Sequence, residues 1–324
     1  MRYLFLNILL FSLFSCEQDE LPIGPHSSGD VFVVQIELES DYKNQVFYSI
    51  DNKKVISENL KTDWDLGFES SSLGWRIILN SSTYSQAIEI TDSDFYDPID
   101  VSQLDWNWDN PKGINEGTAI GDHRGRSYFY IIDRGYNLNG TSRGYRKMRV
   151  DSVTDSYYII TYAKLDNSHE TTSQINKSDE TYFNYFSFTD QSIVNIAPSN
   201  LDWDLLFTQY THIYNDNETT PSYLVTGVLI NYLNNIEVAK DTLNSFDDIT
   251  YEMAIASNYT YLKEQDIIGF DWKSYDFDNQ LYSADPNIVY IIKTAIGRYH
   301  KLHFIDFYNS NGEKGYPRFQ IQEL

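Results

Sequence analysis

The segment from Phe207 to Tyr214 carries the side chains best suited to hold iron. It reads Phe-Thr-Gln-Tyr-Thr-His-Ile-Tyr, so Tyr210 and Tyr214 flank His212 two residues away on either side. Residues two apart on a strand point to the same face of the sheet. A neutral imidazole is a common metal ligand, and neighbouring phenols make an iron-ligand cluster credible. We therefore predict His212 as a metal ligand; the alternative is an ordinary histidine at the end of a strand in a tyrosine-rich sheet.

Two further side chains could take part in ligand binding. His123 lies in the charged loop Gly-Asp-His-Arg-Gly, and Met253 lies in a segment with helical features, where it could equally fill a core. Imidazole and thioether groups are the usual axial ligands of haem iron. No pair of His and Met residues has a spacing that identifies two such ligands.

The sequence carries no signature of an enzyme. It contains no nucleophile elbow, no phosphate-binding or dinucleotide-binding glycine loop, and no His-Glu-x-x-His zinc motif. Carboxylates are abundant, but nothing in the pattern singles out a catalytic pair. We predict a binding protein rather than an enzyme.

Composition narrows the possible partners. The 324 residues include 47 acidic and 24 basic side chains, which gives a net charge of −23. Such a surface offers no counter-charge to nucleic acid or to anionic lipid, so neither is an expected partner. Aromatic residues make up 16% of the chain, which indicates a folded core rather than disorder. A single cysteine excludes a disulfide framework.

That cysteine follows an apolar run at the N-terminus. Residues 1–15 have the layout of a secretory signal, and Leu13-Phe14-Ser15-Cys16 resembles a bacterial lipobox, which implies cleavage before Cys16 and its lipidation. The acidic residues 17–20 are similar to export signals of surface-displayed lipoproteins. Residues 16–30 therefore form a predicted lipidated tether. The expected location is the outer membrane, with the protein held by its lipid anchor only and facing the cell exterior.

An internal repeat organises the rest of the chain. Six short motifs recur in the same order, among them Phe47-Tyr48-Ser49 with Tyr185-Phe186-Ser187, and Asp63-Trp64-Asp65-Leu66 with Asp202-Trp203-Asp204-Leu205. The ordered set predicts two related units, residues 31–170 and 180–324. The polar segment 166–181 between them is predicted to be a linker.

Both units are predicted to consist of strands. Stretches rich in aromatic and β-branched residues, several with period-two alternation, alternate with turns rich in Gly, Asn and Asp. Predicted strands cover residues 31–39, 45–50, 128–133, 157–163 and 288–294. Helical signals are sparse, and the best covers 245–256 with Ser245 as its N-cap. The fold class is therefore all-β, with antiparallel sheets in two tandem related units and one or two short helices.

The repeated Trp-Asp-Leu motif suggests a structural role for its aspartates. Strand alternation places Trp64 with Leu66 and Phe68 on one face and Asp65 on the other. The second copy has the same pattern. Because the whole motif is duplicated, its aspartates are expected to accept hydrogen bonds from turn amides rather than to catalyse a reaction.

The last repeated element contains two more histidines. His300 and His303 have opposite strand parity, so they cannot hold one metal ion together. Arginines occupy the aligned positions in the first unit, which predicts that both histidines are solvated. Met148 aligns with Leu302 and is predicted to fill the core.

Taken together, these motifs resemble the HmuY-like family of surface lipoproteins of Bacteroidota. The clearest stretches are Asp202 to Phe207 and Val289 to Phe307. The resemblance implies an all-β, lipid-anchored protein that binds haem through two axial His, or Met in some relatives, and passes it to a TonB-dependent outer-membrane receptor. The ligands of the family cannot be transferred to this sequence residue by residue.

Two hypotheses follow. The first is a surface lipoprotein that binds haem or a similar bulky ligand and delivers it to an outer-membrane receptor. The alternative is a non-catalytic glycan- or protein-binding module, whose many Tyr and Trp side chains would contact sugars or a partner.

Overall fold

The structure is a computed structural model that describes residues 27–113, 115, 117–214 and 222–324. Antiparallel strands form nearly all of its regular structure, and within these residues the α-helical element is α1 (Tyr251–Ile255). Three short 3-10 turns cover Ser81–Thr83, Val101–Gln103 and Tyr232–Asn234. The prediction of an all-β fold is confirmed. Across the described part of the chain, no helix is long and apolar enough to cross a membrane.

The first of two β-sandwiches, here called sandwich 1, is built from residues 66–194. One of its sheets has the strand order β13-β12-β4-β5-β7 and the other has the order β11-β10-β9-β8-β6. A core of apolar side chains from both sheets, including the predicted core residue Met148, lies between them. The strands are β4 (Leu66–Glu69), β5 (Arg76–Leu79), β6 (Gln86–Ile90), β7 (Gly121–Asp122), β8 (Phe129–Asp133), β9 (Tyr145–Val153), β10 (Tyr157–Ala163), β11 (Thr171–Asn176), β12 (Phe183–Ser187) and β13 (Ser192–Val194).

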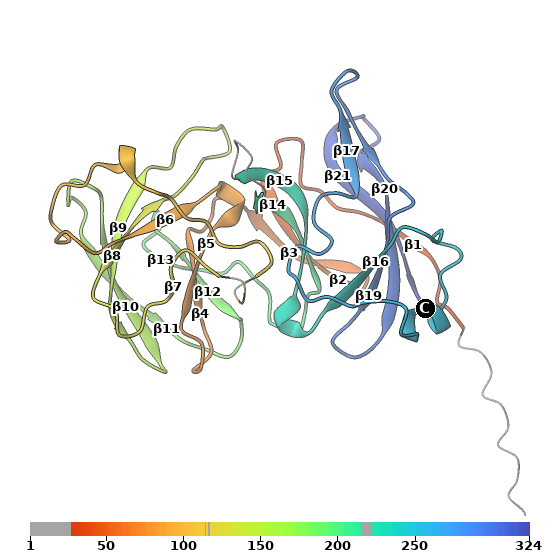
Figure 1. The fold of residues 1–324 in the computed structure, drawn as a ribbon, viewed down its shortest axis with the longest axis horizontal. Helices are drawn as coiled ribbons and strands as arrows, with labels where there is room; N and C mark the ends of the chain where they lie inside the picture. Colours follow the sequence, from red (N-terminus) through yellow and green to blue (C-terminus); the bar gives the residue numbers. More distant parts are fainter. Residues whose placement is uncertain (1–26, 114, 116, 215–221) are drawn as a thin grey trace, which may run out of the picture.

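The second, sandwich 2, combines the start and the end of the described chain. Its sheets have the orders β15-β14-β2-β3 and β1-β21-β20-β19-β16, and a projecting two-stranded hairpin, β17-β18, is attached to it (Figure 1). The strands are β1 (Phe32–Gln35), β2 (Asn44–Ser49), β3 (Lys54–Leu60), β14 (Leu205–Ile213), β15 (Ser222–Ile230), β16 (Glu237–Asp241), β17 (Lys273–Asp276), β18 (Leu281–Ala284), β19 (Val289–Lys293), β20 (Tyr299–Tyr308) and β21 (Lys314–Glu323). The two sandwiches lie side by side along the long axis of the molecule (Figure 1).

The repeated strands are exchanged between the sandwiches. Strand β2, which carries the first Phe-Tyr-Ser motif, pairs with β14 of the second Trp-Asp-Leu motif, whereas β12 pairs with β4 of the first. The registers are equivalent, because Phe47 is opposite Leu206 and Tyr185 is opposite Gly67. The boundary between the two sequence repeats therefore differs from the boundary between the two sandwiches, because each sandwich contains strands of both repeats.

Both Trp-Asp-Leu aspartates hold these exchanged strands. Asp65 accepts a hydrogen bond from the backbone N–H of Phe188, just after β12, with an N–O distance of 2.7 Å. Asp204 accepts one from the N–H of Ile50, just after β2, also at 2.7 Å. The predicted role in accepting turn amides is confirmed in both copies.

The alternation predicted for the Trp-Asp-Leu motifs is wrong for the tryptophans. Leu66 and Phe68 enter the core of sandwich 1, but Trp64 packs with Trp203 in a separate cluster. Strand β4 begins only at Leu66, so the alternation of a strand does not extend back to Trp64.

Two local predictions are also wrong. The helix begins at Tyr251 with Thr250 as its N-cap, not at Ser245, whose hydroxyl instead donates to Asp248 within a turn. The segment predicted as a linker contains β11, which pairs along its whole length with β10. It is polar because it is an edge strand, and only Ile175 enters the core.

Candidate ligand-binding sites

His212 lies near the end of β14, beside the loop that leads into residue 270. Its side chain is 26% exposed, and its ring contacts those of Tyr214 and Phe270 at centroid distances of 4.9 and 5.1 Å. Nδ1 is buried and lies 4.0 Å from the Asp266 Oδ2 oxygen. The ring is therefore partly exposed, with Nδ1 on its buried side.

This arrangement suits a single metal ligand. Metal-binding histidines commonly direct one ring nitrogen at a carboxylate, which orients the ring and leaves the other nitrogen for the metal. Asp266 is placed behind His212 in this sense, although 4.0 Å is longer than a hydrogen bond. Burial raises the pKa of Asp266 above its usual range, and the nearby imidazole partly offsets that rise.

The two predicted tyrosine neighbours differ from each other. Tyr210 is buried, and its hydroxyl lies against Gly269, where an added Cβ would approach it to 3.3 Å. Burial raises the pKa of Tyr210 far above its usual range, so the phenol keeps its proton. Tyr214 is half-buried and meets the His212 ring edge to face. Tyr210 is thus the buried phenol of this cluster, and Tyr214 is the partly exposed one.

His123 and Met253 are not brought together with His212. His123 belongs to sandwich 1, where it is 3% exposed and its Nδ1 lies 3.1 Å from the Tyr130 hydroxyl. Burial lowers the pKa of His123, so it is a neutral core imidazole. Met253 packs on the outer face of the sheet that contains β19 and β20. Among the described residues, no three His, Cys, Asp or Glu side chains form a metal-binding group.

The prediction that His300 and His303 are solvated is wrong. His300 is fully buried with Nε2 3.5 Å from Asp51 Oδ1, and His303 stacks on Phe246 while its Nε2 bonds Gln320. Residues 246–261 cover the outer face of this sheet, so β20 is buried on both sides. The opposite orientation of the two rings is confirmed, because they meet different layers.

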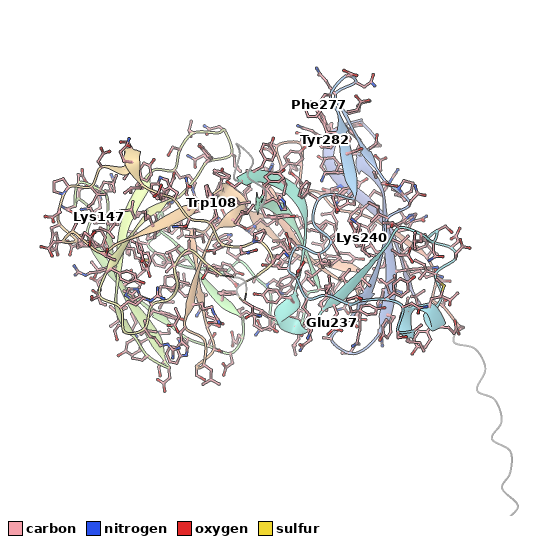
Figure 2. All side chains as sticks on the ribbon, viewed as in Figure 1. Trp108, Lys147, Glu237, Lys240, Phe277 and Tyr282 are labelled. Carbon is pink, nitrogen blue, oxygen red and sulfur yellow. The ribbon has the colours of Figure 1, made fainter. Side chains whose placement is uncertain are left out.

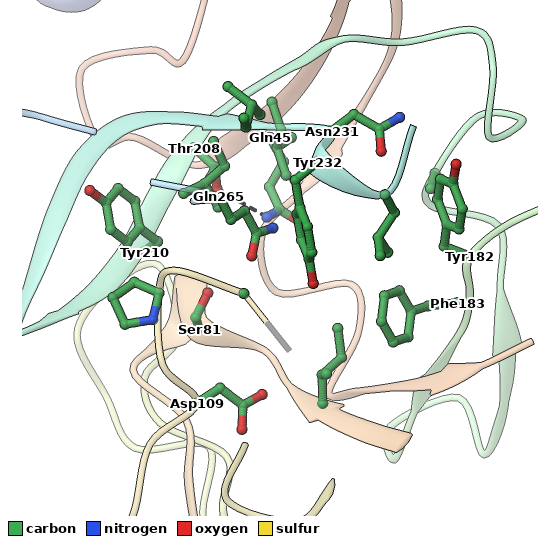
Figure 3. A pocket seen from close by; sticks show the side chains of 18 of the residues that line it. Gln45, Ser81, Asp109, Tyr182, Phe183, Thr208, Tyr210, Asn231, Tyr232 and Gln265 are labelled. Atoms are coloured by element: carbon green, nitrogen blue, oxygen red, sulfur yellow. Dashed lines mark hydrogen bonds between the residues drawn. The ribbon is translucent and has the colours of Figure 1, made fainter. Parts of the chain in front are cut away.

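A cavity of about 110 Å³ lies between the two sandwiches (Figure 3). Equivalent residues of the two repeats line it, because the exchanged strands and both Trp-Asp-Leu motifs meet there. Its aromatic walls are Phe47, Trp64, Phe183, Tyr185, Trp203 and Tyr232.

Asp109 is the one charged side chain among the described residues that line this cavity. Its two carboxylate oxygens accept hydrogen bonds from the backbone N–H groups of Leu79 and Ala119, at 2.7 and 2.8 Å. Burial nevertheless raises the pKa of Asp109 to about 7.

The site residues predicted from the sequence include the His212 cluster but not Asp109 nor, apart from Tyr210, the other described residues that line the cavity. Asp109 lies in an irregular loop without a recognisable pattern. The sequence feature that could have indicated the cavity is the duplication of the aromatic motifs. Residues that recur in both copies meet in one cluster if the copies exchange strands.

The model of the HmuY protein family matches the chain twice, at residues 41–184 and 179–321. The chain belongs to the HmuY family. The two matches cover most of the sequence, and they follow the repeat described above. No curated protein matches the chain significantly.

Several solved structures share a distant likeness with this HmuY-family chain. Apo PinO from Porphyromonas gingivitis is 8% identical, with 91% of this chain and 97% of that one aligned and a TM-score of 0.30. An apo HmuY analogue from Tannerella forsythia is also 8% identical, with coverages of 93% and 98% and a TM-score of 0.26. A protein from Bacteroides vulgatus described as HmuY-like and haem-binding is 16% identical, with coverages of 54% and 89% and a TM-score of 0.22. Because these TM-scores are low, the assignment of the chain to the HmuY family rests on the family-model match.

Proposed function

We propose that this HmuY-family protein binds haem, or a similarly bulky iron-bearing ligand, with His212 as an iron ligand, and delivers it to a TonB-dependent outer-membrane receptor. The observation that carries the proposal is the partly exposed ring of His212, which contacts two aromatic rings and has a carboxylate near Nδ1. Family membership supports the choice of ligand. The role is one of binding rather than catalysis.

In this proposal His212 would be one iron ligand, and no second His or Met lies beside it among the described residues. The cavity between the sandwiches is smaller than the roughly 300–1,000 Å³ of pockets that hold drug-sized ligands. The partly exposed side chain of His212 is therefore the better position for a macrocycle.

Anchoring at the cell surface is part of the proposal. It rests on the lipobox-like sequence that ends at Cys16, which lies outside the described residues. The receptor is proposed from the family resemblance, and the lipid anchor would keep the protein in the same membrane.

A haem titration of residues 21–324 tests the proposal. We expect a sharp Soret shift, and we expect His212→Ala to weaken haem binding by about tenfold or more because the imidazole ligand is lost. His169→Asn is the matched control: His169 is exposed with φ +57°, a conformation that asparagine tolerates. An unchanged spectrum at saturating haem would overturn the proposal, and so would equal binding by the His212 and His169 variants.

One observation favours the alternative of a glycan- or protein-binding module. The β17-β18 hairpin projects from sandwich 2 and presents Phe277 and Leu281 at 84% and 51% exposure, near Tyr282 (Figure 2). Exposed aromatic groups of this kind are typical of contact surfaces. Binding to immobilised glycans or surface proteins that is lost in Phe277→Ala and kept in His212→Ala would favour this second function.

A further inference from the structure

The cavity between the sandwiches has a lining unlike that of a packing defect. Dry voids left by imperfect packing are lined by apolar groups only. Here the aromatic walls include an acid, Asp109, with no Lys, Arg or His among the described lining residues to compensate it. In Figure 3, Asp109 and Ser81 lie on the side opposite Tyr232 and Gln265.

The environment of Asp109 favours a cationic partner. Its carboxylate oxygens each accept one backbone amide, which leaves further lone pairs for a ligand. The other titratable groups among the described residues that line the cavity are Tyr182, Tyr185, Tyr210 and Tyr232. Burial raises the pKa of Tyr185 and of Tyr210, so these phenols remain neutral. An ammonium group would neutralise the one unpaired charge and would also be attracted by the aromatic rings.

The size of the cavity limits the rest of the ligand. A cavity of about 150 Å³ lined by apolar side chains is large enough to bind benzene. The volume here is about 110 Å³, with an opening toward solvent. Because this volume is below about 150 Å³, the enclosed space holds at most one aromatic ring, and a chain on that ring must lie toward the opening.

We propose that this cavity is a binding site for a single-ring aromatic amine, whose ring packs among Phe47, Trp64 and Trp203 and whose ammonium group pairs with Asp109. The site is separate from His212 and does not depend on the proposed binding of haem. The strongly negative net charge of the protein adds a long-range attraction for such cations.

Calorimetric titration of the mature chain with three probes of similar shape tests the proposal. The probes are 2-phenylethylamine, 2-phenylethanol and phenylacetate, which differ in charge at the same position. We expect the amine to bind about tenfold or more tightly than the alcohol, and the acid not to bind. Affinity for the amine is expected to rise between pH 6 and pH 8, as Asp109 loses its proton.

Two variants separate the roles of the charge and the space. Asp109→Asn should remove the preference for the amine over the alcohol. If that variant does not fold, because the acid also holds two backbone amides, Ala197→Leu tests the site by filling the cavity, and it should weaken the amine at least tenfold. Equal affinity for amine and alcohol in the wild-type chain, or unchanged amine binding in Ala197→Leu, would overturn the proposal.

His212→Ala is the matched control for independence from haem. It should bind the amine as the wild-type chain does, even when haem binding is lost. Failure of the amine titration alone therefore leaves the proposed function standing, and failure of the haem titration alone leaves the amine site standing.

Discussion

The two sandwiches use the same aspartate for the same hydrogen bond but surround it differently. In sandwich 1, Asp65 also pairs with Arg134 and Arg143, at nitrogen–oxygen distances of 2.8 and 3.0 Å, and all three side chains are buried. In sandwich 2, Asp204 has no basic partner among the described residues, and burial together with the nearby Asp51 raises its pKa to about 6.

The difference arises in the hairpin that follows the Tyr-Ile-Ile strand. In sandwich 1 the loop between Arg134 and Gly144 is long, and it returns Arg143 to the aspartate. In sandwich 2 the equivalent backbone bond joins Thr294 to Arg298, so Thr294 takes the place of Arg134. Arg298 itself pairs with Asp51 and Glu323 rather than with Asp204. The shared function of the motif is thus to hold the exchanged strand, and the arginines belong to one copy only.

The largest expected effect is that of Asp65→Asn. This change keeps the size of the side chain but leaves two buried guanidinium groups without their counter-charge, so we expect a loss of about 3–5 kcal/mol in the free energy of unfolding. Urea denaturation measures it. A loss below about 1 kcal/mol would mean that other groups stabilise the arginines. The ion pairs of Asp65 would then not make sandwich 1 more stable than a sandwich without them.

A second test concerns a feature that the copies share. Asn80 donates to the carbonyl oxygens of Lys61 and Trp64 at 2.7 and 2.8 Å, and Asn231 donates to those of Asn200 and Trp203 at 3.0 Å each. Both amides are buried. We expect Asn80→Ala and Asn231→Ala each to cost about 2 kcal/mol in the same denaturation experiment.

Agreement of the two losses within about 1 kcal/mol would support the structural equivalence of the repeats. A large cost at one position with none at the other would contradict it.

The smallest expected effect is a dependence of the free energy of unfolding on pH, caused by Asp204. Because its pKa is raised in the folded protein, the folded state binds this proton more tightly than the unfolded state does. The stabilisation that comes from this tighter proton binding is fully present below about pH 4, and it is lost as the pH rises through about 6. We expect Asp204→Asn to remove this decline, which amounts to about 1–2 kcal/mol between pH 4.5 and pH 7.

Asp202→Asn, an exposed aspartate in the same motif, is the control for the Asp204 variant. A decline that persists in Asp204→Asn and matches the wild-type profile would assign the effect to another group.

Local sequence patterns predicted the strands well, because alternation and β-branched residues report which faces are buried. They could not predict which strands pair, since β2 and its repeat equivalent β12 carry nearly the same motif. Either strand would fit either partner by local criteria. The exchange emerges only when both sheets are assembled.

The errors at the histidines have a similar origin. The arginines aligned with His300 and His303 suggested solvent, but residues 246–261 form a layer that covers His303, and His300 is buried on the opposite face beside Asp51. At His212 the nearby tyrosines could be predicted from strand spacing. Asp266 and Phe270 could not, because they reach the ring from a distant loop.

The exchange of strands also sets an order in which the chain can fold. Sandwich 1 is continuous in sequence, but Ile50 and Asp204, which meet in sandwich 2, are 154 residues apart. The β2-β3 hairpin must therefore wait, with an unpaired edge, until β14 becomes available, and such non-local pairing is slow. During that interval the hairpin of one molecule can complete the sandwich of another. Refolding at high concentration should thus produce interlocked dimers, whereas a circular permutant that places residues 29–60 after Leu324 should fold faster and remain monomeric.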